Sequence, residues 1–429
     1  MRVLVIPGTT LVALEVLRSL RHVKGIQLIG AGSDTALGAS WAYDEYFFLP
    51  EINDSTLQQL QDLVTYSKIE YIIFAHDEWL FRFSSKKRIG AAKLIVSSEE
   101  SIRVSSFKKK TYEILGEFVK VPRIYSKDVS FGDLPLFVKP DRGQGARNTF
   151  QILSKNDLES FLRIYDESFL ICEFLDGDEF TVDCFSLTNH EVIYVACRKR
   201  NDFSDGISKS TFYQDLSEFV DSWANIFSLR LQIVGAWFFQ FKFDSESQPV
   251  LLELGMRVAG ASGVSRLRGV NLSLLNLHLF SSETTRLSLY GQRNLASTFD
   301  GGYFDLGFNF SQIYVDLDDT LIVNENLNLN LIRYLQNQYI NETKVAIITR
   351  NPNPEVLLSN YPELASFGNE IVRVPPNSSK AAYIDSFSTP FLFIDDSHAE
   401  RIEVKSIFGD TVLVLDPSFC SQGDMVSER

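Results

Sequence analysis

The stretch that decides the fold runs from residue 134 to residue 147 and reads LPLFVKPDRGQGAR. Its apolar start predicts a strand that delivers Lys139 to a loop containing Gly143 and Gly145. Glycine reaches the backbone conformations that let N–H groups fold over phosphate oxygens, and a lysine adds a positive charge. The stretch therefore fits a phosphate-binding loop, although taken alone it is better explained as a surface hairpin.

Two later stretches follow it in order, CEFLDGDEFTVD at residues 172–183 and LELGMR at residues 252–257. Together with residues 134–147 they resemble the ATP-grasp superfamily, in particular its carbamoyl-phosphate-synthase-like branch of carboxylate–amine ligases. The resemblance covers roughly residues 1–300 and rests on the order and spacing of the three stretches. It implies ATP and Mg²⁺ as cofactors, with a small-molecule carboxylate and an amine as substrates.

The resemblance also assigns roles to individual residues. Lys108 and Lys139 would hold the ATP phosphates, beside a flexible loop formed by Gly143, Gln144 and Gly145, although Lys109 and Lys110 leave the register of Lys108 open. Arg257 would steady the transferred phosphate, as fixed cations do in phosphoryl transfer. The remaining roles are an adenine-reading hinge at Glu173, Phe174 and Leu175, ribose binding by Glu179, and metal ligation by Gln240 and Glu253.

One departure from the family pattern concerns the second metal ligand. The family often reads Glu-x-Asn-Pro-Arg here, whereas this chain has Gly255 and Met256 in place of Asn and Pro. Either one Mg²⁺ held by Gln240 and Glu253 is enough, or the site binds ATP weakly and turns over slowly. A further basic group, Arg198, Arg200 and Lys209, falls where family members contact the triphosphate or the acid substrate; a solvated basic face is the alternative.

A second motif, DLDDT at residues 316–320, directly follows the apolar run 313–315. Two carboxylates spaced two residues apart at a strand end can direct one group at phosphorus and the other at the leaving oxygen. Thr349, Lys380 and the Asp395–Asp396 pair follow in order, each near the end of a predicted strand or loop. This series resembles the haloacid dehalogenase (HAD) superfamily of aspartyl phosphatases, with accidental strand-capping residues as the weaker alternative.

By this resemblance Asp316 is the nucleophile, and Asp318 protonates the leaving group and then activates water. Thr349 and Lys380 would offset the phosphate charge, while Asp316, the Asp318 carbonyl, Asp395 and Asp396 would hold Mg²⁺. The short spacing from Thr320 to Thr349 leaves little room for a cap domain, so we expect an open site suited to a large or protein-delivered phosphate ester.

The chain as a whole reads as a multidomain α/β protein. Its 429 residues predict about three domains. We expect a pre-ATP-grasp, Rossmann-like unit at 1–98, an ATP-grasp α+β domain at 99–300, and a Rossmann-like HAD domain with little or no cap at 309–420. Residues 283–309 read as a connecting segment. The turn Pro7-Gly8-Thr9-Thr10 after the first strand lacks G-x-G-x-x-G spacing, so we expect no dinucleotide there.

Composition excludes several other classes of protein. The net charge of −14, without a long basic run, argues against nucleic acid as a partner. No apolar run is long enough for a membrane span, and the four cysteines lack metal-ligand spacing, so we expect a cytoplasmic protein with reduced cysteines. Related ligases are often dimers, so the resemblance suggests a homodimer.

The sequence therefore predicts a bifunctional enzyme. An ADP-forming ligase would join a carboxylate to an amine through an acyl phosphate, and the C-terminal phosphatase would act on a phosphate ester of the same pathway. The alternative is a HAD phosphatase regulated by an ATP-grasp module that binds nucleotide but is inactive. A binding scaffold without turnover is a third reading, which the complete set of Asp316, Asp318, Thr349 and Lys380 disfavours.

Overall fold

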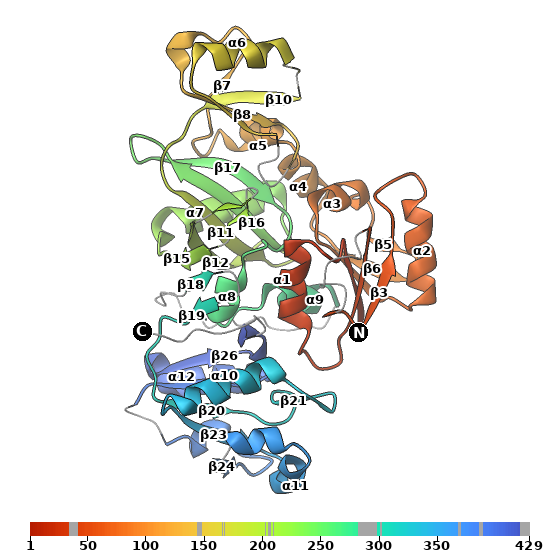
Figure 1. Ribbon diagram of the computed structural model, residues 1–429, viewed down its shortest axis with the longest axis vertical. Coiled ribbons are helices and arrows are strands. Elements are labelled where there is room, and N and C mark those ends of the chain that lie inside the picture. Colours follow the sequence, from red (N-terminus) through yellow and green to blue (C-terminus); the bar gives the residue numbers. More distant parts are fainter. Residues whose placement is uncertain are drawn as a thin grey trace.

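The computed structural model of the chain describes residues 1–33, 42–143, 148–164, 166, 168–201, 203–204, 207–208, 210–281, 298–300, 303–367, 370–385 and 389–420. Its strands form three units along the chain (Figure 1). The first unit spans β1 to β6, the middle unit spans β7 to β19, and the C-terminal unit spans β20 to β26 and the turn of 3₁₀ helix, η6, that follows. None of the described helices is long and apolar enough to cross a membrane.

The first unit is a six-stranded sheet in the order β3-β2-β1-β4-β6-β5, parallel except for the β5–β6 hairpin. Strand β1 is apolar from Val3 to Ile6 because both of its faces are covered there. Val3 and Val5 pack in a cluster with α1, while Leu4 and Ile6 pack with α2 and α3. The bounds are β1 Arg2–Ile6, α1 Leu11–Leu20, β2 Gln27–Gly32, β3 Glu45–Phe48, α2 Thr56–Tyr66, β4 Tyr71–Phe74, α3 Asp77–Phe83, β5 Arg88–Ile89 and β6 Ala92–Ile95.

Tyrosine rings fill the space beside the turn that follows β1. The Tyr43 hydroxyl donates to the Gly8 carbonyl at 2.8 Å. A Cβ atom on Gly30 would lie 2.6 Å from the Tyr46 ring. The missing side chains of these glycines therefore leave room for the two rings to pack against the strand ends.

The middle unit contains two larger antiparallel sheets, with strand orders β7-β10-β8-β9 and β17-β16-β11-β12-β15-β18-β19, and the two-stranded sheet β13-β14. Helix α6 accompanies the smaller sheet at the far end of the molecule (Figure 1). The bounds are α4 Glu99–Ser105, α5 Lys108–Leu115, β7 Ile124–Tyr125, β8 Leu136–Pro140, β9 Phe150–Ile152, α6 Lys155–Ile164, β10 Phe169–Glu173, β11 Glu179–Ser186, β12 Val192–Arg200, β13 Phe203–Ser204, β14 Ile207–Ser208, β15 Ser210–Tyr213, α7 Ser217–Leu231, β16 Gly235–Phe243, β17 Pro249–Gly255, α8 Gly263–Leu267, α9 Leu272–Ser281, β18 Thr298–Asp300 and β19 Tyr303–Asp305.

Part of the segment expected to be a connection is instead strand. Strand β18 pairs with β15 and with β19, so residues 298–300 and 303–305 extend the large sheet of the middle unit. The glycines of this segment suggested a linker, but the short aromatic runs at Phe299 and at Tyr303–Phe304 have strand propensity.

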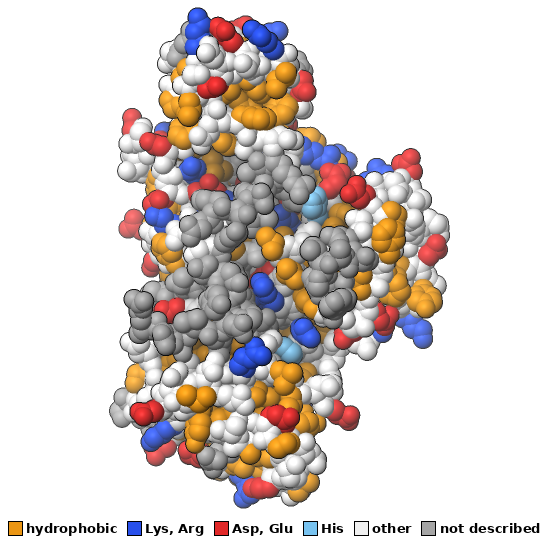
Figure 2. All heavy atoms as spheres, viewed as in Figure 1, with side chains coloured by type: hydrophobic (Ala, Val, Ile, Leu, Met, Phe, Trp, Pro, Cys, Tyr) orange, Lys and Arg blue, Asp and Glu red, His pale blue; other side chains and the backbone are white. Residues whose placement is uncertain are grey.

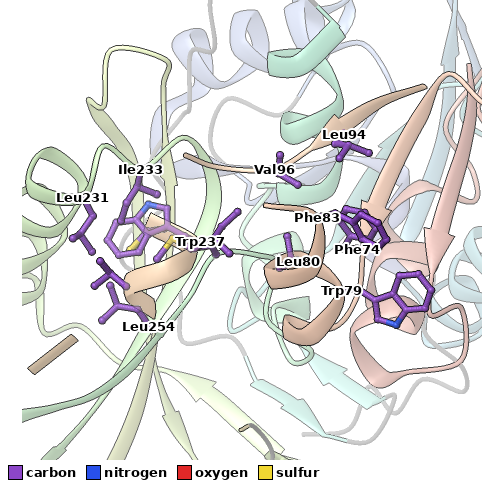
Figure 3. Packing of buried hydrophobic residues seen from close by; sticks show 14 of the residues in the cluster. Phe74, Trp79, Leu80, Phe83, Leu94, Val96, Leu231, Ile233, Trp237 and Leu254 are labelled. Carbon is purple, nitrogen blue, oxygen red and sulfur yellow. The ribbon is translucent and has the colours of Figure 1, made fainter. Parts of the chain in front are cut away.

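The first and middle units share one hydrophobic core. A single cluster runs from Phe74, Trp79 and Phe83 of the first unit to Trp237 and Phe241 of the large sheet. Figure 3 shows the aromatic rings of the first unit and Trp237 joined by Leu80 and Val96 between them. The two units therefore pack as one body.

The C-terminal unit is a five-stranded, fully parallel sheet in the order β24-β23-β20-β25-β26. Successive residues of β20 face opposite sides: Ile313 and Val315 pack with α10, and Tyr314 packs with α12. The bounds are β20 Gln312–Val315, β21 Ile322–Val323, β22 Asn326–Leu327, α10 Leu329–Ile340, β23 Lys344–Thr349, α11 Pro354–Ser359, β24 Glu370–Arg373, η4 Lys380–Tyr383, β25 Phe391–Ile394, α12 His398–Phe408, β26 Val412–Leu415 and η6 Pro417–Cys420.

A buried polar junction joins all three units. The Arg266 guanidinium on α8 donates to both carboxylate oxygens of Glu15 on α1, at 2.9 and 3.0 Å, and to the Ser418 carbonyl on η6 at 2.7 Å. The side chains of Arg266 and Glu15 are 2% and 1% exposed. Asn271 adds hydrogen bonds to the Ser19 carbonyl and the Ser418 hydroxyl. The junction fixes α1 against the C-terminal unit.

Replacing Arg266 by Met should therefore lower the midpoint of urea unfolding strongly. The substitution leaves the Glu15 carboxylate buried without its cation, which typically costs about 3–5 kcal/mol. As a control, Arg103→Met removes an exposed pair with Glu99 one helical turn away and should cost no more than about 1 kcal/mol. Equal shifts for the two variants would contradict this account of the junction.

Candidate functional site

The expected nucleotide site lies where the first and middle units meet. A cleft there is lined by the start of α3, the start of α5, residues 142–143 after β8, and strand β17. Asp77, Lys108, Gly143 and Glu253 all line it. The structure thus gathers three of the residues predicted to serve ATP and adds a carboxylate from the first unit.

Lys108 and Lys139 approach the site from different elements. The Lys108 ammonium donates to the Gly143 carbonyl at 3.0 Å and lies 3.9 Å from a carboxylate oxygen of Glu253. Burial lowers the pKa of Lys108, an effect that Glu253 opposes and the Lys139 charge reinforces. Two cations held so close to each other form a site that favours an anion.

Lys139 is 7% exposed on β8, and its ammonium donates to the Tyr112 hydroxyl at 2.7 Å. That hydroxyl in turn donates to the Leu252 carbonyl on β17 at 2.6 Å. Tyr112 lies one turn beyond Lys108 on α5, so one helix orders both lysines. Sequence reasoning missed Tyr112, although its spacing from Lys108 was readable.

Gln240 and Glu253 lie directly opposite each other on the neighbouring strands β16 and β17. The Gln240 amide oxygen accepts from Arg200 at 3.1 Å, and its amide nitrogen donates to the Thr181 hydroxyl at 3.3 Å. Arg200 also pairs with Glu179. Arg200 therefore contacts both Glu179, predicted to bind ribose, and Gln240, predicted to bind metal. It is not part of a solvated face.

The other predicted groups are placed as follows. Arg198 forms a buried pair with Asp183, 2.9 Å from guanidinium nitrogen to carboxylate oxygen, so a solvated face is wrong for it as well. At the expected hinge, the Glu173 backbone N–H donates to the Arg123 carbonyl at 3.0 Å, and its carboxylate accepts from the Arg123 N–H at 2.9 Å. Phe174 and Leu175 follow β10, with Leu175 buried. Gln144, Gly145 and Lys209 lie outside the described residues.

Arg257, predicted to steady the transferred phosphate, pairs with a carboxylate of the first unit. Its guanidinium donates to both carboxylate oxygens of Asp77 at 2.8 Å and does not line the cleft that contains Lys108. The guanidinium carbon also lies 5.3 Å from the centre of the Phe238 ring. Arg257 thereby ties the end of β17 to the first unit, while Asp77 faces the cleft.

The glycine that replaces the usual second metal ligand is required by packing. A Cβ atom on Gly255 would lie 2.3 Å from the Phe238 ring, and Met256 is buried in the shared core. Strand β17 therefore leaves no room for a side chain at 255 while Phe238 keeps its place. The packing of this region of the sheet therefore excludes a metal-ligating side chain at position 255.

Gly255→Asn should accordingly lower the midpoint of urea unfolding. Overpacking of this kind lowers the free energy of unfolding by about 1–3 kcal/mol. The two substitutions should be non-additive: because Phe238→Ala vacates the space, Gly255→Asn should cost less in the Phe238→Ala background than in the unchanged chain. Gly132→Asn is the control, since a Cβ there meets only the Ser130 hydroxyl at 3.6 Å. An unchanged midpoint in the single Gly255 variant would show that the sheet accommodates a ligand here.

The second candidate site lies at the carboxyl edge of the five-stranded sheet. Asp316 follows the central strand β20, and its N–H donates to the Ile394 carbonyl of β25 at 2.9 Å. Thr349 ends the neighbouring strand β23 on the other side, and Asp395 and Asp396 follow β25. Because all of these strands are parallel, their carboxyl ends deliver the polar groups to one edge.

Lys380 lies at the centre of this second group. Its ammonium contacts Asp316 at 2.5 Å and Asp395 at 2.7 Å, and its side chain is 4% exposed. Burial lowers the pKa of Lys380, but the two carboxylates outweigh it and the net shift is upward. Lys380 therefore stays charged.

Two hydrogen-bonding residues that the sequence left without a role hold the acidic side chains. The Thr320 hydroxyl donates to Asp316 at 3.2 Å and accepts from the Asp396 N–H at 3.0 Å. The Asn351 amide donates to Asp318 at 3.1 Å, beside the Thr349 hydroxyl at 3.3 Å from the same carboxylate. Asn351 lies two residues after Thr349, and only the geometry of the loop shows that it contacts Asp318.

The donor set of this site fits a divalent cation. Carboxylate oxygens of Asp316, Asp395 and Asp396 lie within 4.8 Å of one another, the one such acidic or metal-ligating group among the described residues. Burial, reinforced by the neighbouring Asp395 charge, raises the pKa of Asp316 and raises that of Asp396 to about 6. Lys380 alone leaves an excess of negative charge, which oxygen-liganded Mg²⁺ would balance.

Comparison with known proteins bears on the first two units. Residues 165–294 match the family described as ATP-grasp in the biosynthetic pathway with Ter operon. The search of curated proteins found no match. The family match ends before the C-terminal unit begins, so the HAD resemblance stays a prediction from the residues.

Several solved structures are similar to the chain. The biotin carboxylase domain of Hydrogenobacter thermophilus 2-oxoglutarate carboxylase, with MgADP, ADP and bicarbonate, is 15% identical with a TM-score of 0.58, over 69% of this chain and 73% of that one. Campylobacter jejuni biotin carboxylase is 14% identical with a TM-score of 0.54, over 69% and 74%. Staphylococcus aureus N5-carboxyaminoimidazole synthetase with ADP is 14% identical with a TM-score of 0.51, over 65% and 76%. The chain has an ATP-grasp-like α/β fold.

Proposed function

We propose that the protein is a bifunctional enzyme, an ATP-dependent carboxylate–amine ligase joined to a Mg²⁺-dependent aspartyl phosphatase. The ligase proposal is carried by the convergence of Lys108, Gly143 and Glu253 in one cleft of an ATP-grasp-like fold. Solved relatives of that fold contain ADP, in one case as MgADP. ATP and Mg²⁺ are accordingly the cofactors we assign to this half.

In the ligase half, Lys108 and Lys139 would bind the ATP phosphates, and Glu253 with Gln240 would provide oxygen ligands for Mg²⁺. The bound metal would neutralise charge on the phosphates. A carboxylate oxygen of the substrate attacks the γ-phosphorus and ADP leaves, and an amine nitrogen then attacks the acyl carbon and releases inorganic phosphate. The Gln240 amide oxygen accepts one hydrogen bond from Arg200, which leaves its second lone pair for this role.

In the phosphatase half, the Asp316 carboxylate attacks the phosphorus of a phosphate ester while Asp318 gives its proton to the leaving oxygen. Asp318 then accepts a proton from the water that hydrolyses the phospho-aspartate. Lys380 and Thr349 offset charge on the phosphate oxygens, and Mg²⁺ would add to that offset when bound by Asp316, the Asp318 carbonyl, Asp395 and Asp396. We propose that the ester belongs to the same pathway as the ligase substrate.

ADP formation by an Asp316→Asn variant tests the ligase, because phosphate release by the second site is then removed from the readout. Mg²⁺-ATP is supplied with pooled carboxylic acids and pooled amines, separately and together. ADP that appears only with both pools supports the ligase. Absence of ADP despite measurable ATP binding favours the second candidate, a phosphatase regulated by an inactive nucleotide-binding module.

The second candidate has one specific observation in its favour. Phe238 leaves no space for a metal-ligating side chain at position 255, so the nucleotide site has one metal ligand fewer than the family pattern provides. A site of that kind can bind nucleotide without rapid turnover.

A further inference from the structure

A lysine of the first unit reaches the rim of the proposed phosphatase site. Lys24 lies in the segment after α1, and its ammonium is 2.5 Å from a carboxylate oxygen of Asp319. Asp319 stands between Asp318 and Thr320 in the DLDDT motif. A residue from the far end of the chain thus contacts the catalytic loop.

The buried junction explains how Lys24 is held there. Helix α1 is anchored through Glu15 to Arg266, and its last turn is anchored through the Ser19 carbonyl to Asn271, which also contacts Ser418. Lys24 follows Ser19 by five residues. The contact between Lys24 and Asp319 is therefore supported by fixed, buried groups on both sides. Figure 2 shows Lys and Arg side chains gathered along this boundary.

Lys24 is more exposed to solvent than the other cations around this site. Lys380 is buried between Asp316 and Asp395, Arg350 pairs with Glu400, and Arg401 donates to the carbonyls after β25. Lys24 is 63% exposed and its partner Asp319 is 26% exposed. A substrate anion can therefore approach its ammonium.

The partner of Lys24, Asp319, is the residue next to Asp318 in the chain. The hydrogen bond and ion pair with Asp319 raise the pKa of Lys24, and the charges of Asp396 and Asp318 raise it further. The ammonium is thus within electrostatic reach of Asp318, the residue that would protonate the leaving oxygen. Between β20 and β23 the C-terminal unit has only the β21–β22 hairpin and α10 among its described elements, so it brings no cap of its own.

We infer that Lys24 is a specificity-determining residue that binds an anionic group on the leaving alcohol, so that phosphorylated carboxylic acids are preferred over otherwise uncharged phosphate esters. The inference rests on the proposed phosphatase function. The first unit then takes the place of a cap, and the expected fully open site is partly closed by a neighbouring unit. A phosphorylated acid also matches the chemical class that the ligase half would use.

Two esters that differ by one carboxylate, phenyl phosphate and 4-carboxyphenyl phosphate, provide the test. Phosphate release is measured with the full-length protein and Mg²⁺ for the unchanged chain, Lys24→Gln and Lys24→Arg. The matched control is Lys87→Gln, an exposed lysine beside the edge strand β5. Thermal unfolding midpoints verify that all variants are folded.

The unchanged chain should prefer the carboxylated ester. Lys24→Gln should lower kcat/KM for that ester by about fivefold, mainly through KM, and lower it for phenyl phosphate by less than about twofold, as expected for an exposed ion pair. Lys24→Arg should restore the preference, Lys87→Gln should leave it unchanged, and added salt should reduce it.

Equal losses on both esters in Lys24→Gln would overturn the inference and show that Lys24 acts only by holding Asp319. Unchanged values on both esters would overturn it as well. If the unchanged chain releases phosphate from neither ester nor from other phosphate esters, the proposed phosphatase itself fails, and the role of Lys24 fails with it.

Discussion

Asp316→Asn should abolish phosphate release from phosphate esters, with a loss of at least about a thousandfold in kcat. An amide lacks the nucleophilic oxygen that would form the bond to phosphorus. It also removes one of the three carboxylates that fit Mg²⁺. The measurement is release of inorganic phosphate from aryl phosphates at saturating Mg²⁺.

Asp385→Asn is the matched control, because Asp385 is an exposed carboxylate of the same unit. It should retain full activity. Folding of the Asp316 variant is verified by its unfolding midpoint, which should not fall, since the substitution relieves crowded buried carboxylates. Phosphatase activity that survives Asp316→Asn would exclude the aspartyl mechanism at this site.

Glu253→Gln should remove the benefit of Mg²⁺ for nucleotide binding and reduce ADP formation by about a hundredfold or more. Glu253 is the one carboxylate among the metal ligands proposed for the nucleotide site. Its amide replacement keeps the shape of the side chain but loses its charge. The first measurement is the Kd for ADP with and without Mg²⁺, which requires no knowledge of the acid or amine.

Glu246→Gln, in the exposed turn after β16, is the control and should keep the Mg²⁺ dependence of the unchanged chain. An equal gain from Mg²⁺ in the Glu253 variant would mean that the metal is held elsewhere. ADP binding that is unaffected by Mg²⁺ even in the unchanged chain would instead favour the regulated phosphatase over the active ligase.

The parallel sheets are the most predictable part of the molecule. In the C-terminal unit, the apolar runs of β20, β23 and β25 each lead into a polar residue, and parallel strands bring those ends to one edge. The order of apolar runs and polar residues is therefore enough to group Asp316, Thr349 and Asp395. Lys380 comes from a 3₁₀ turn, and only its distance along the chain from Thr349 suggests a place for it.

Contacts between units could not be predicted, because a single sequence has no signal for residue pairs far apart in the chain. Arg257 carries the right charge to bind a phosphate, but it forms an ion pair with Asp77 of the first unit. The same limit applies to Lys24 with Asp319 and to Glu15 with Arg266. Gly255 was visible as a departure from the pattern, but its cause, the Phe238 ring, lies on the neighbouring strand.

The junction around Arg266 also affects whether the gene could be split into two during evolution. Leu267 of the middle unit packs into the same hydrophobic cluster as Phe419 of the C-terminal unit. Splitting the gene between the two halves would expose that apolar surface and leave the Glu15–Arg266 pair without its Ser418 partner. Two proteins encoded by separate genes would first need compensating substitutions on both of these surfaces. We therefore expect the two halves to remain encoded by a single gene.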